Sequence, residues 1–299
     1  MTSLAIRLTV LVQRTRVVAY RRLARMLLSL STARARRRLS RTSPIVILLD
    51  NSVLAAAVTH ETRWISTGPK AWGCHWIESG YLARVPVRRK PKRSAPSAER
   101  RDYEEVCYLV GLVHLARLGL VEFKTAGELQ IEQWRQPVGR FAGYGYFDHN
   151  LFHGIDIAQL DRMPTMSFAP DWMKVPNLTE QQRERLRTTD DALYKGIVKH
   201  LGGKHSQDAW HIRTAEKHGA FCFLTTDHSL RRHFSERSKQ EPLRSLTTTV
   251  LTPAEVGRRL GLRPVDPKFL SYEGEADVPT RPDLSMPGNK RRRYGKRRP

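Results

Sequence analysis

The stretch Ile45-Val46-Ile47-Leu48-Leu49-Asp50-Asn51-Ser52-Val53 decides the fold of this chain. Its five consecutive aliphatic residues predict a strand buried on both faces, as in a parallel sheet covered by helices. Asp50 then lies at the carboxyl end of the strand, the edge at which open α/β sheets bind ligands. A second apolar run, Ala220-Phe221-Cys222-Phe223-Leu224-Thr225-Thr226, ends on Asp227. The two runs therefore predict two aspartates at one edge of the sheet, which together would form a site.

Further strands and helices alternate along the chain from Pro44 to Leu260. A helix is predicted directly after Asp50, with Asn51 or Ser52 as its N-cap. The other predicted elements are helices at about 103–118, 127–134, 179–187, 191–201, 208–218 and 252–261, and strands at 120–125, 220–226 and 247–251. Capping motifs at Thr179-Glu180-Gln181-Gln182 and Thr252-Pro253-Ala254-Glu255 support two of the helix starts. This alternation predicts an α/β fold, a three-layer sandwich with a largely parallel central sheet.

The positive charge of the chain is concentrated in three segments. The whole sequence holds 52 Lys and Arg against 29 Asp and Glu, a formal net charge of +23. Residues 1–41 carry 11 arginines and no acid, while 84–101 and 290–298 each carry a net charge of +7. The rest of the chain is close to neutral. We therefore expect a globular body with basic arms, which either attract a polyanion such as RNA or are solvated tails.

This charge distribution suggests three parts. Residues 1–43 are predicted to be a basic, disordered N-terminal extension, 44–262 the folded domain, and 263–299 a polar, basic C-terminal tail. The composition of 1–43 is also typical of an organellar transit peptide, and an upstream extension from a misplaced start site is a third interpretation. Two insertions are predicted to be irregular, the basic, Pro-containing 84–101 and the Gly- and aromatic-rich 135–176. Aromatic residues of the second insertion could stack on unpaired bases or pack within the loop.

The cysteines and the hydropathy pattern exclude several classes of protein. Cys74, Cys107 and Cys222 are widely spaced and odd in number, so neither a disulfide framework nor a zinc site is indicated. A reducing, cytoplasmic location is the expectation. No apolar stretch approaches the roughly 20 residues that a membrane span needs, so no membrane partner is expected.

At the ends of the predicted strands the sequence resembles the PIN-domain nucleases, whose simplest members are the VapC-type toxins of toxin–antitoxin pairs. The resemblance covers roughly 44–256 and lies in Leu48-Leu49-Asp50-Asn51-Ser52-Val53, in Thr125-Ala126-Gly127-Glu128-Leu129-Gln130-Ile131-Glu132, in Asp208-Ala209-Trp210-His211-Ile212 through Ala215, and in Leu224-Thr225-Thr226-Asp227. It implies a PIN-like domain with four acids at the carboxyl edge of the sheet, which coordinate Mg²⁺ or Mn²⁺ for phosphodiester hydrolysis. By position these catalytic and metal-binding acids are Asp50, Glu132, Asp208 and Asp227, with Glu128 as the alternative to Glu132.

General chemistry points the same way. Several carboxylates gathered at one edge raise one another's pKa unless a cation is present. Carboxylate oxygens suit Mg²⁺ or Mn²⁺, and such ions can promote the hydrolysis of a phosphodiester. The hydroxyls of Ser52, Thr225 and Thr226 would hold metal-bound waters or phosphate, or serve as caps. His211, three residues after Asp208 on the same helix face, would orient a carboxylate.

The sequence therefore predicts a divalent-metal-dependent endoribonuclease. RNA is the expected partner, and an antitoxin protein and a second copy of the chain are left open as further partners. One alternative is a non-catalytic RNA-binding protein on a PIN-like scaffold, in which the basic arms hold RNA. Another is a structure-specific DNA nuclease. Convergence of the four acids would favour the enzyme, and an acid that points away would favour the scaffold.

Overall fold

The computed structural model describes residues 2–86, 90–134, 151–152, 154–169 and 171–270. Its centre is a five-stranded sheet in the order β5-β4-β1-β6-β7. The strands are β1 (Ile45–Leu49), β4 (Val121–Thr125), β5 (Ala158–Gln159), β6 (Cys222–Leu224) and β7 (Thr249–Leu251). Every neighbouring pair is parallel, so the prediction of an α/β fold with a parallel central sheet is confirmed.

The register of the sheet brings the ends of β1 and β6 to one level. Leu49 of β1 lies beside Leu224 of β6, and the Asp50 N–H donates to Leu224 O (2.9 Å). Asp50 and Thr225 therefore follow the two strands at the same edge. Since β1 has β4 on its other side, the segment after β4 reaches this edge too.

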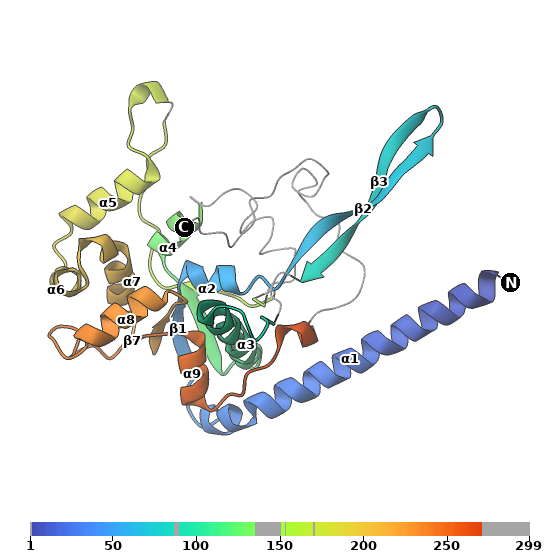
Figure 1. Cartoon of the computed structure of the whole chain (residues 1–299). Coiled ribbons are helices and arrows are strands. Elements are labelled where there is room, and N and C mark those ends of the chain that lie inside the picture. Colours follow the sequence, from blue (N-terminus) through green and yellow to red (C-terminus); the bar gives the residue numbers. More distant parts are fainter. Residues whose placement is uncertain (1, 87–89, 135–150, 153, 170, 271–299) are drawn as a thin grey trace.

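Helices cover both faces of the sheet (Figure 1). Ile47 and Leu49 point to a core formed with α2 (Asn51–Ala56), α3 (Ser97–Arg117) and α9 (Pro253–Leu260), whereas Leu48 and Phe223 point to the opposite core. The second core includes residues from α4 (Gly127–Trp134), α5 (Leu178–Thr188), α6 (Ala192–Leu201), α7 (Ser206–Lys217) and α8 (His228–Arg237). Strand residues that alternate between two apolar layers explain why β1 reads as an unbroken aliphatic run.

The predicted caps are correct at one helix and displaced at another. The Thr252 side chain accepts from the Glu255 N–H, Glu255 reaches back to the Thr252 N–H, and Gly261 ends α9 in the left-handed region with φ 81°. At α5 the N-cap is Asn177, not Thr179, and its capping-box partner is Glu180. Asn177 is suited to the N-cap position because its carboxamide oxygen accepts from two backbone N–H groups, those of Thr179 and Glu180.

The N-terminal segment differs from the prediction of a disordered extension over 1–43. Residues Thr2–Leu39 form one helix, α1, and Leu28, Ala35 and Leu39 are buried in the same core as α3 and α9. The small and aliphatic residues recur at helical spacing, while the arginines between them reach solvent with their long side chains. The arginine-rich composition of 1–41 therefore obscured the apolar stripe by which this helix packs against the core.

The C-terminal boundary of the domain also differs from the prediction. The Arg263 N–H donates to Ser31 O of α1 (3.1 Å), and the Val265 N–H donates to Cys107 O of α3 (3.0 Å). The short helix η3 (Pro267–Leu270) lies against α1. Packing therefore continues through residue 270, past the predicted boundary at 262, and 271–299 lie outside the described residues.

The predicted irregular segment at 84–101 is confirmed for 90–96, which form neither helix nor strand and are mostly exposed, whereas 84–86 end a strand and 97–101 begin a helix. Residues 87–89 lie outside the described residues. Strands β2 (His60–Trp72) and β3 (His75–Pro86) form a long antiparallel hairpin that projects from the body (Figure 1). Ser97 begins α3, with Pro96 in the N-cap position. The hairpin satisfies its backbone by pairing, and in its described side chains, at 66–80, none is buried, so these residues leave no clear hydrophobic period in the sequence.

The second predicted insertion, 135–176, is described only in part, since 135–150 lie outside the described residues. Its later half supplies β5, which extends the sheet beside β4 at the positions of Lys124 and Thr125. A short helix, η1 (Asp171–Met173), follows. In the described part of the chain, no helix combines the length and the apolarity that a membrane crossing requires.

Candidate functional site

Asp50 is held at the carboxyl edge by two hydroxyl groups. Its Oδ2 accepts hydrogen bonds from Ser52 Oγ (2.5 Å) and from Thr225 Oγ1 (2.7 Å). The same hydroxyls accept from the backbone, Ser52 Oγ from the Thr226 N–H and Thr225 Oγ1 from the Asp227 N–H, both at 3.0 Å. The end of β6 is thereby tied to the first turn after β1, and one carboxylate is fixed between them.

Glu132 on α4 is the second acid that the fold brings to this edge. Its Oε1 lies 3.0 Å from His211 Nε2 and accepts from Gln182 Nε2 (3.2 Å), and its Oε2 accepts from Asn51 Nδ2 (3.3 Å). Asn51 follows Asp50 directly, so this contact joins the second acid to the first.

Glu128, the alternative second acid, has a different role. Its buried carboxylate makes a bidentate salt bridge with Arg185 of α5, at 2.9 and 3.0 Å. The pair links α4 to α5. Glu128 lies four residues before Glu132 in α4. Of the two acids that the sequence left open, Glu132 is the one beside Asp50.

Asp208 reaches the site from the start of α7. This helix leads into β6, so its first turn lies near the edge at which β6 ends. Asp208 Oδ2 lies 2.9 Å from His205 Nδ1, and His205 Nε2 in turn lies 3.3 Å from His233 Nδ1. His205 thus orients the carboxylate of Asp208, while His211, expected to orient a carboxylate, contacts Glu132.

Asp227 is used differently. Its side chain is exposed, and its Oδ1 accepts from the Ser229 N–H (2.8 Å) and the Leu230 N–H (3.1 Å), which caps α8. Its backbone N–H contacts Thr225, but no hydrogen bond joins its side chain to the other three acids within the described residues. The structure therefore gathers Asp50, Glu132 and Asp208, together with His211, into one group, which we call the acid cluster.

The groups of the acid cluster act on one another electrostatically. Burial raises the pKa of Asp50, and the charge of Glu132 adds to this rise, while hydrogen bonds from Ser52 and Thr225 oppose it. Burial also raises the pKa of Asp208, with a further contribution from the charge of Asp50. Both carboxylates are therefore harder to ionise than usual, as expected where like charges share a site.

The acids of the cluster act in the opposite direction on His211. Burial alone would lower its pKa, but the neighbouring charges of Glu132, Asp208 and Asp50 raise it above the ordinary value. Its Nδ1 is buried and has no hydrogen-bond partner in the described part of the chain. The cluster thus stabilises positive charge in its interior.

The donor chemistry of the cluster fits a hard divalent cation, although the side chains do not form a closed ligand set. Oδ1 of Asp50 and Oδ1 of Asp208 receive no hydrogen bond from the described residues, so each acid keeps one oxygen for a ligand. Carboxylate oxygens are the ligands that Mg²⁺ and Mn²⁺ prefer. However, no group of three or more His, Cys, Asp or Glu side chains in the described ranges is placed so that it could hold a metal ion.

Three supporting residues were missed by sequence reasoning. Gln182 is fully buried and accepts from Gln207 Nε2 (2.6 Å) while donating to Glu132. Asn51 also donates to Glu132, and His205 contacts Asp208. The only signal for Asn51 was its place beside Asp50. Gln182 and His205 stand in the sequence among other polar helix residues, with nothing to mark them.

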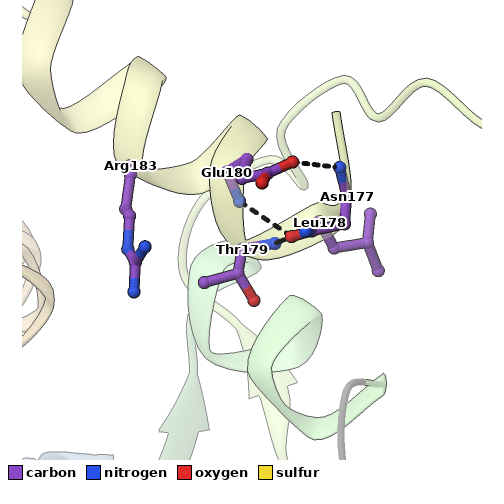
Figure 2. Close-up of a pocket in the computed structure, with 5 residues that line it drawn as sticks. All are labelled: Asn177, Leu178, Thr179, Glu180 and Arg183. Atoms are coloured by element: carbon purple, nitrogen blue, oxygen red, sulfur yellow. Dashed lines mark hydrogen bonds between the residues drawn. The ribbon is translucent and has the colours of Figure 1, made fainter. Parts of the chain in front are cut away.

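A separate pocket of about 550 Å³ lies at the N-terminus of α5 (Figure 2). Its lining residues are Asn177, Leu178, Thr179, Glu180 and Arg183. Asn177 and Glu180 use their side chains on one another's backbone N–H groups, so these polar atoms serve the capping box. None of the lining residues belongs to the acid cluster.

Comparison with known proteins gives no relative. No protein-family model matches the chain, and no curated protein or solved structure matches it.

Proposed function

We propose that this protein is a divalent-metal-dependent endoribonuclease with its active site at the acid cluster. The observation that carries the proposal is the meeting of Asp50, Glu132 and Asp208 at the carboxyl edge of a parallel sheet, the place where such folds bind ligands. The resemblance of these positions to the PIN-domain nucleases supports the same conclusion.

The residues of the site would divide the work. Asp50 and Asp208 would bind Mg²⁺ or Mn²⁺ through their remaining oxygens, since their other oxygens are already held by Ser52, Thr225 and His205. A bound cation would supply Lewis-acid stabilisation of the phosphodiester and activation of the attacking water. Glu132 would complete the negative charge of the site, with His211 fixing its orientation.

The charge of the chain supports a nucleic-acid substrate. Lys90, Lys92 and Arg93, on the connection between β3 and α3, are exposed. Together with the arginines of α1, they provide positive charge outside the acidic site, which would attract the phosphate backbone. RNA is the substrate that the resemblance to VapC-type toxins favours, and an antitoxin partner belongs to the same proposal.

One observation favours a second candidate, a non-catalytic RNA-binding protein. Asp227 uses its Oδ1 to cap α8, and both oxygens of Glu132 accept hydrogen bonds, so within the acid cluster only Asp50 and Asp208 keep an oxygen without a hydrogen bond from the described residues. In this alternative the acid cluster would be structural, and the basic surface alone would hold RNA. A structure-specific DNA nuclease differs from the main proposal in substrate only.

A cleavage assay separates these candidates. The purified protein is incubated with single-stranded and hairpin RNA and with DNA oligonucleotides, with Mn²⁺ or with EDTA. We expect cleavage of RNA in Mn²⁺ that is lost in EDTA and in Asp50→Asn. The matched control is Asp190→Asn, which changes a fully exposed carboxylate of the same type. Binding of RNA without cleavage would support the scaffold, and cleavage of DNA alone would support the DNA nuclease.

A further inference from the structure

Helix α1 carries a second apolar stripe on the side opposite the core. Its buried stripe includes Ala24, Leu28, Ala35 and Leu39. The other stripe consists of Ala19, Leu23, Met26, Leu30 and Ala33, and we call it the outer seam. Leu23, Met26 and Leu30 are 37%, 54% and 63% exposed. Two apolar stripes on one helix are not needed to build the domain, so the outer seam requires another explanation.

The spacing of the outer seam is that of a coiled coil. Its members follow one another at alternating steps of four and three residues, the heptad repeat that keeps an apolar seam facing a second helix. Of the six flanking positions, three hold exposed arginines, Arg22, Arg34 and Arg36, and the others hold Tyr20, Leu27 and Ser29. None of these three arginines forms a salt bridge within the part of the chain that the structure describes.

The charges beside the seam select the partner. A second copy of α1 would set arginine against arginine at the flanking positions, because residues 1–41 contain no acid. A helix with acidic residues at those positions would instead form interhelical salt bridges beside the apolar seam. The helix is also presented as a rigid element, since its opposite side is packed against α3, α9 and η3.

We propose that the outer seam of α1 is a docking site for an amphipathic, acidic α-helix of another protein. The partner helix would place its apolar residues between Leu23, Met26 and Leu30 and its carboxylates against Arg22, Arg34 and Arg36. This surface is independent of the acid cluster, so the inference stands whether or not the proposed nuclease activity is correct.

The test uses fluorescence anisotropy with two labelled synthetic peptides of about four heptads, enough for a stable heptad pattern. Both carry Leu at the seam positions, and they differ only in having Glu or Lys at the flanking positions. We expect the full chain to bind the acidic peptide, more tightly at low salt, and not the basic one. Leu23→Gln combined with Leu30→Gln should weaken binding at least tenfold, while the control Leu118→Gln, at a comparably exposed leucine that directly follows α3, should leave it unchanged.

Three outcomes would overturn the proposal. Binding of the acidic peptide that is unaffected by the double substitution would place the contact elsewhere. Self-association in analytical ultracentrifugation that the double substitution abolishes would identify a second copy as the occupant. Binding to vesicles with anionic lipids that the double substitution abolishes, without binding of the acidic peptide, would identify a lipid surface.

Discussion

His211 Nε2 lies 3.0 Å from Glu132 Oε1, although the two residues are 79 positions apart in the chain. The contact joins α7 to α4 across the face of the sheet and places a buried imidazole against one of the proposed catalytic acids. The negative charge of Glu132 raises the pKa of His211, so a substitution at Glu132 changes the electrostatic environment of the buried imidazole.

Glu132 and Glu128 allow a matched comparison on one helix. Glu132→Gln should reduce RNA cleavage by about 10–100-fold, because the site loses part of the negative charge that would hold the cation. Glu128→Gln should leave the site intact but unpair Arg185, which costs about 1.5–3 kcal/mol of the free energy of unfolding. Cleavage rates and urea unfolding of both variants check this. The opposite pattern, activity lost in Glu128→Gln and kept in Glu132→Gln, would reassign the second acid.

Asp208→Asn should abolish cleavage without destabilising the metal-free protein. Burial and the charge of Asp50 raise the pKa of Asp208, so the neutral amide removes a carboxylate that the fold disfavours in its ionised form. Asparagine can also keep the contact with His205. We expect the melting temperature in EDTA to be equal to or above that of the parent. A clear drop would show that the ionised Asp208 carboxylate stabilises the fold.

Glu105 should make stability depend on pH. Its Oε2 accepts from the Ala254 N–H (2.7 Å), and burial raises its pKa from 4.5 to about 7. Between about pH 4.5 and pH 7 the folded state binds a proton that the unfolded state has released, so the free energy of unfolding falls as pH rises. Across this pH range, the largest change in the free energy of unfolding that the pKa difference allows is on the order of 3 kcal/mol.

Glu105→Gln isolates this effect, because glutamine keeps an acceptor for the Ala254 N–H and cannot ionise. The difference in unfolding free energy between variant and parent should shift in favour of the variant from pH 5 to pH 8, measured by urea unfolding. Glu104→Gln, at an exposed carboxylate on the same helix, is the control and should show no such trend. Parallel pH curves for Glu105→Gln and the parent would rule out the raised pKa.

The packing of α1 can be checked with two leucines on its two sides. Leu28 is 7% exposed in the core, so Leu28→Ala should lower the free energy of unfolding by about 2–4 kcal/mol. Leu30→Ala removes the same atoms from the outer seam and should change the free energy of unfolding by no more than about 0.5 kcal/mol. Equal, small effects in urea unfolding would mean that 1–43 is a separate extension after all.

The sheet strands β1, β4, β6 and β7 could be predicted because they leave local signals, whereas β5 and the hairpin of β2 and β3 were not predicted. Five aliphatic residues before Asp50 can only be buried on both faces, and Thr252 and Gly261 mark both ends of α9. The buried stripe of α1 was not predicted from the sequence, because its small residues alternate with arginines. The high positive charge of the segment is typical of a disordered extension. Likewise, nothing local distinguishes Glu132 from Glu128, since both are carboxylates on one short helix and their partners come from α5 and α7.

The site itself was predictable only in part for the same reason. Asp50 follows a strand, and its place at the edge is a consequence of the sheet alone. The environment of Asp208 depends on His205 and His233, and that of Glu132 on Gln182, a residue 50 positions away. Such contacts depend on how whole helices pack, which short-range patterns do not encode.

The central claim is that the acid cluster binds a divalent cation. Calorimetric titration of the metal-free protein with Mn²⁺ tests this claim most directly. We predict that the parent and the Asp190→Asn control bind Mn²⁺ with the same affinity, because the Asp190 side chain is exposed and pairs with Lys195. Asp50→Asn should bind it at least about tenfold more weakly, since a carboxylate ligand is lost. Equal Mn²⁺ affinity in Asp50→Asn and the parent, or no binding by the parent, would contradict the proposed site.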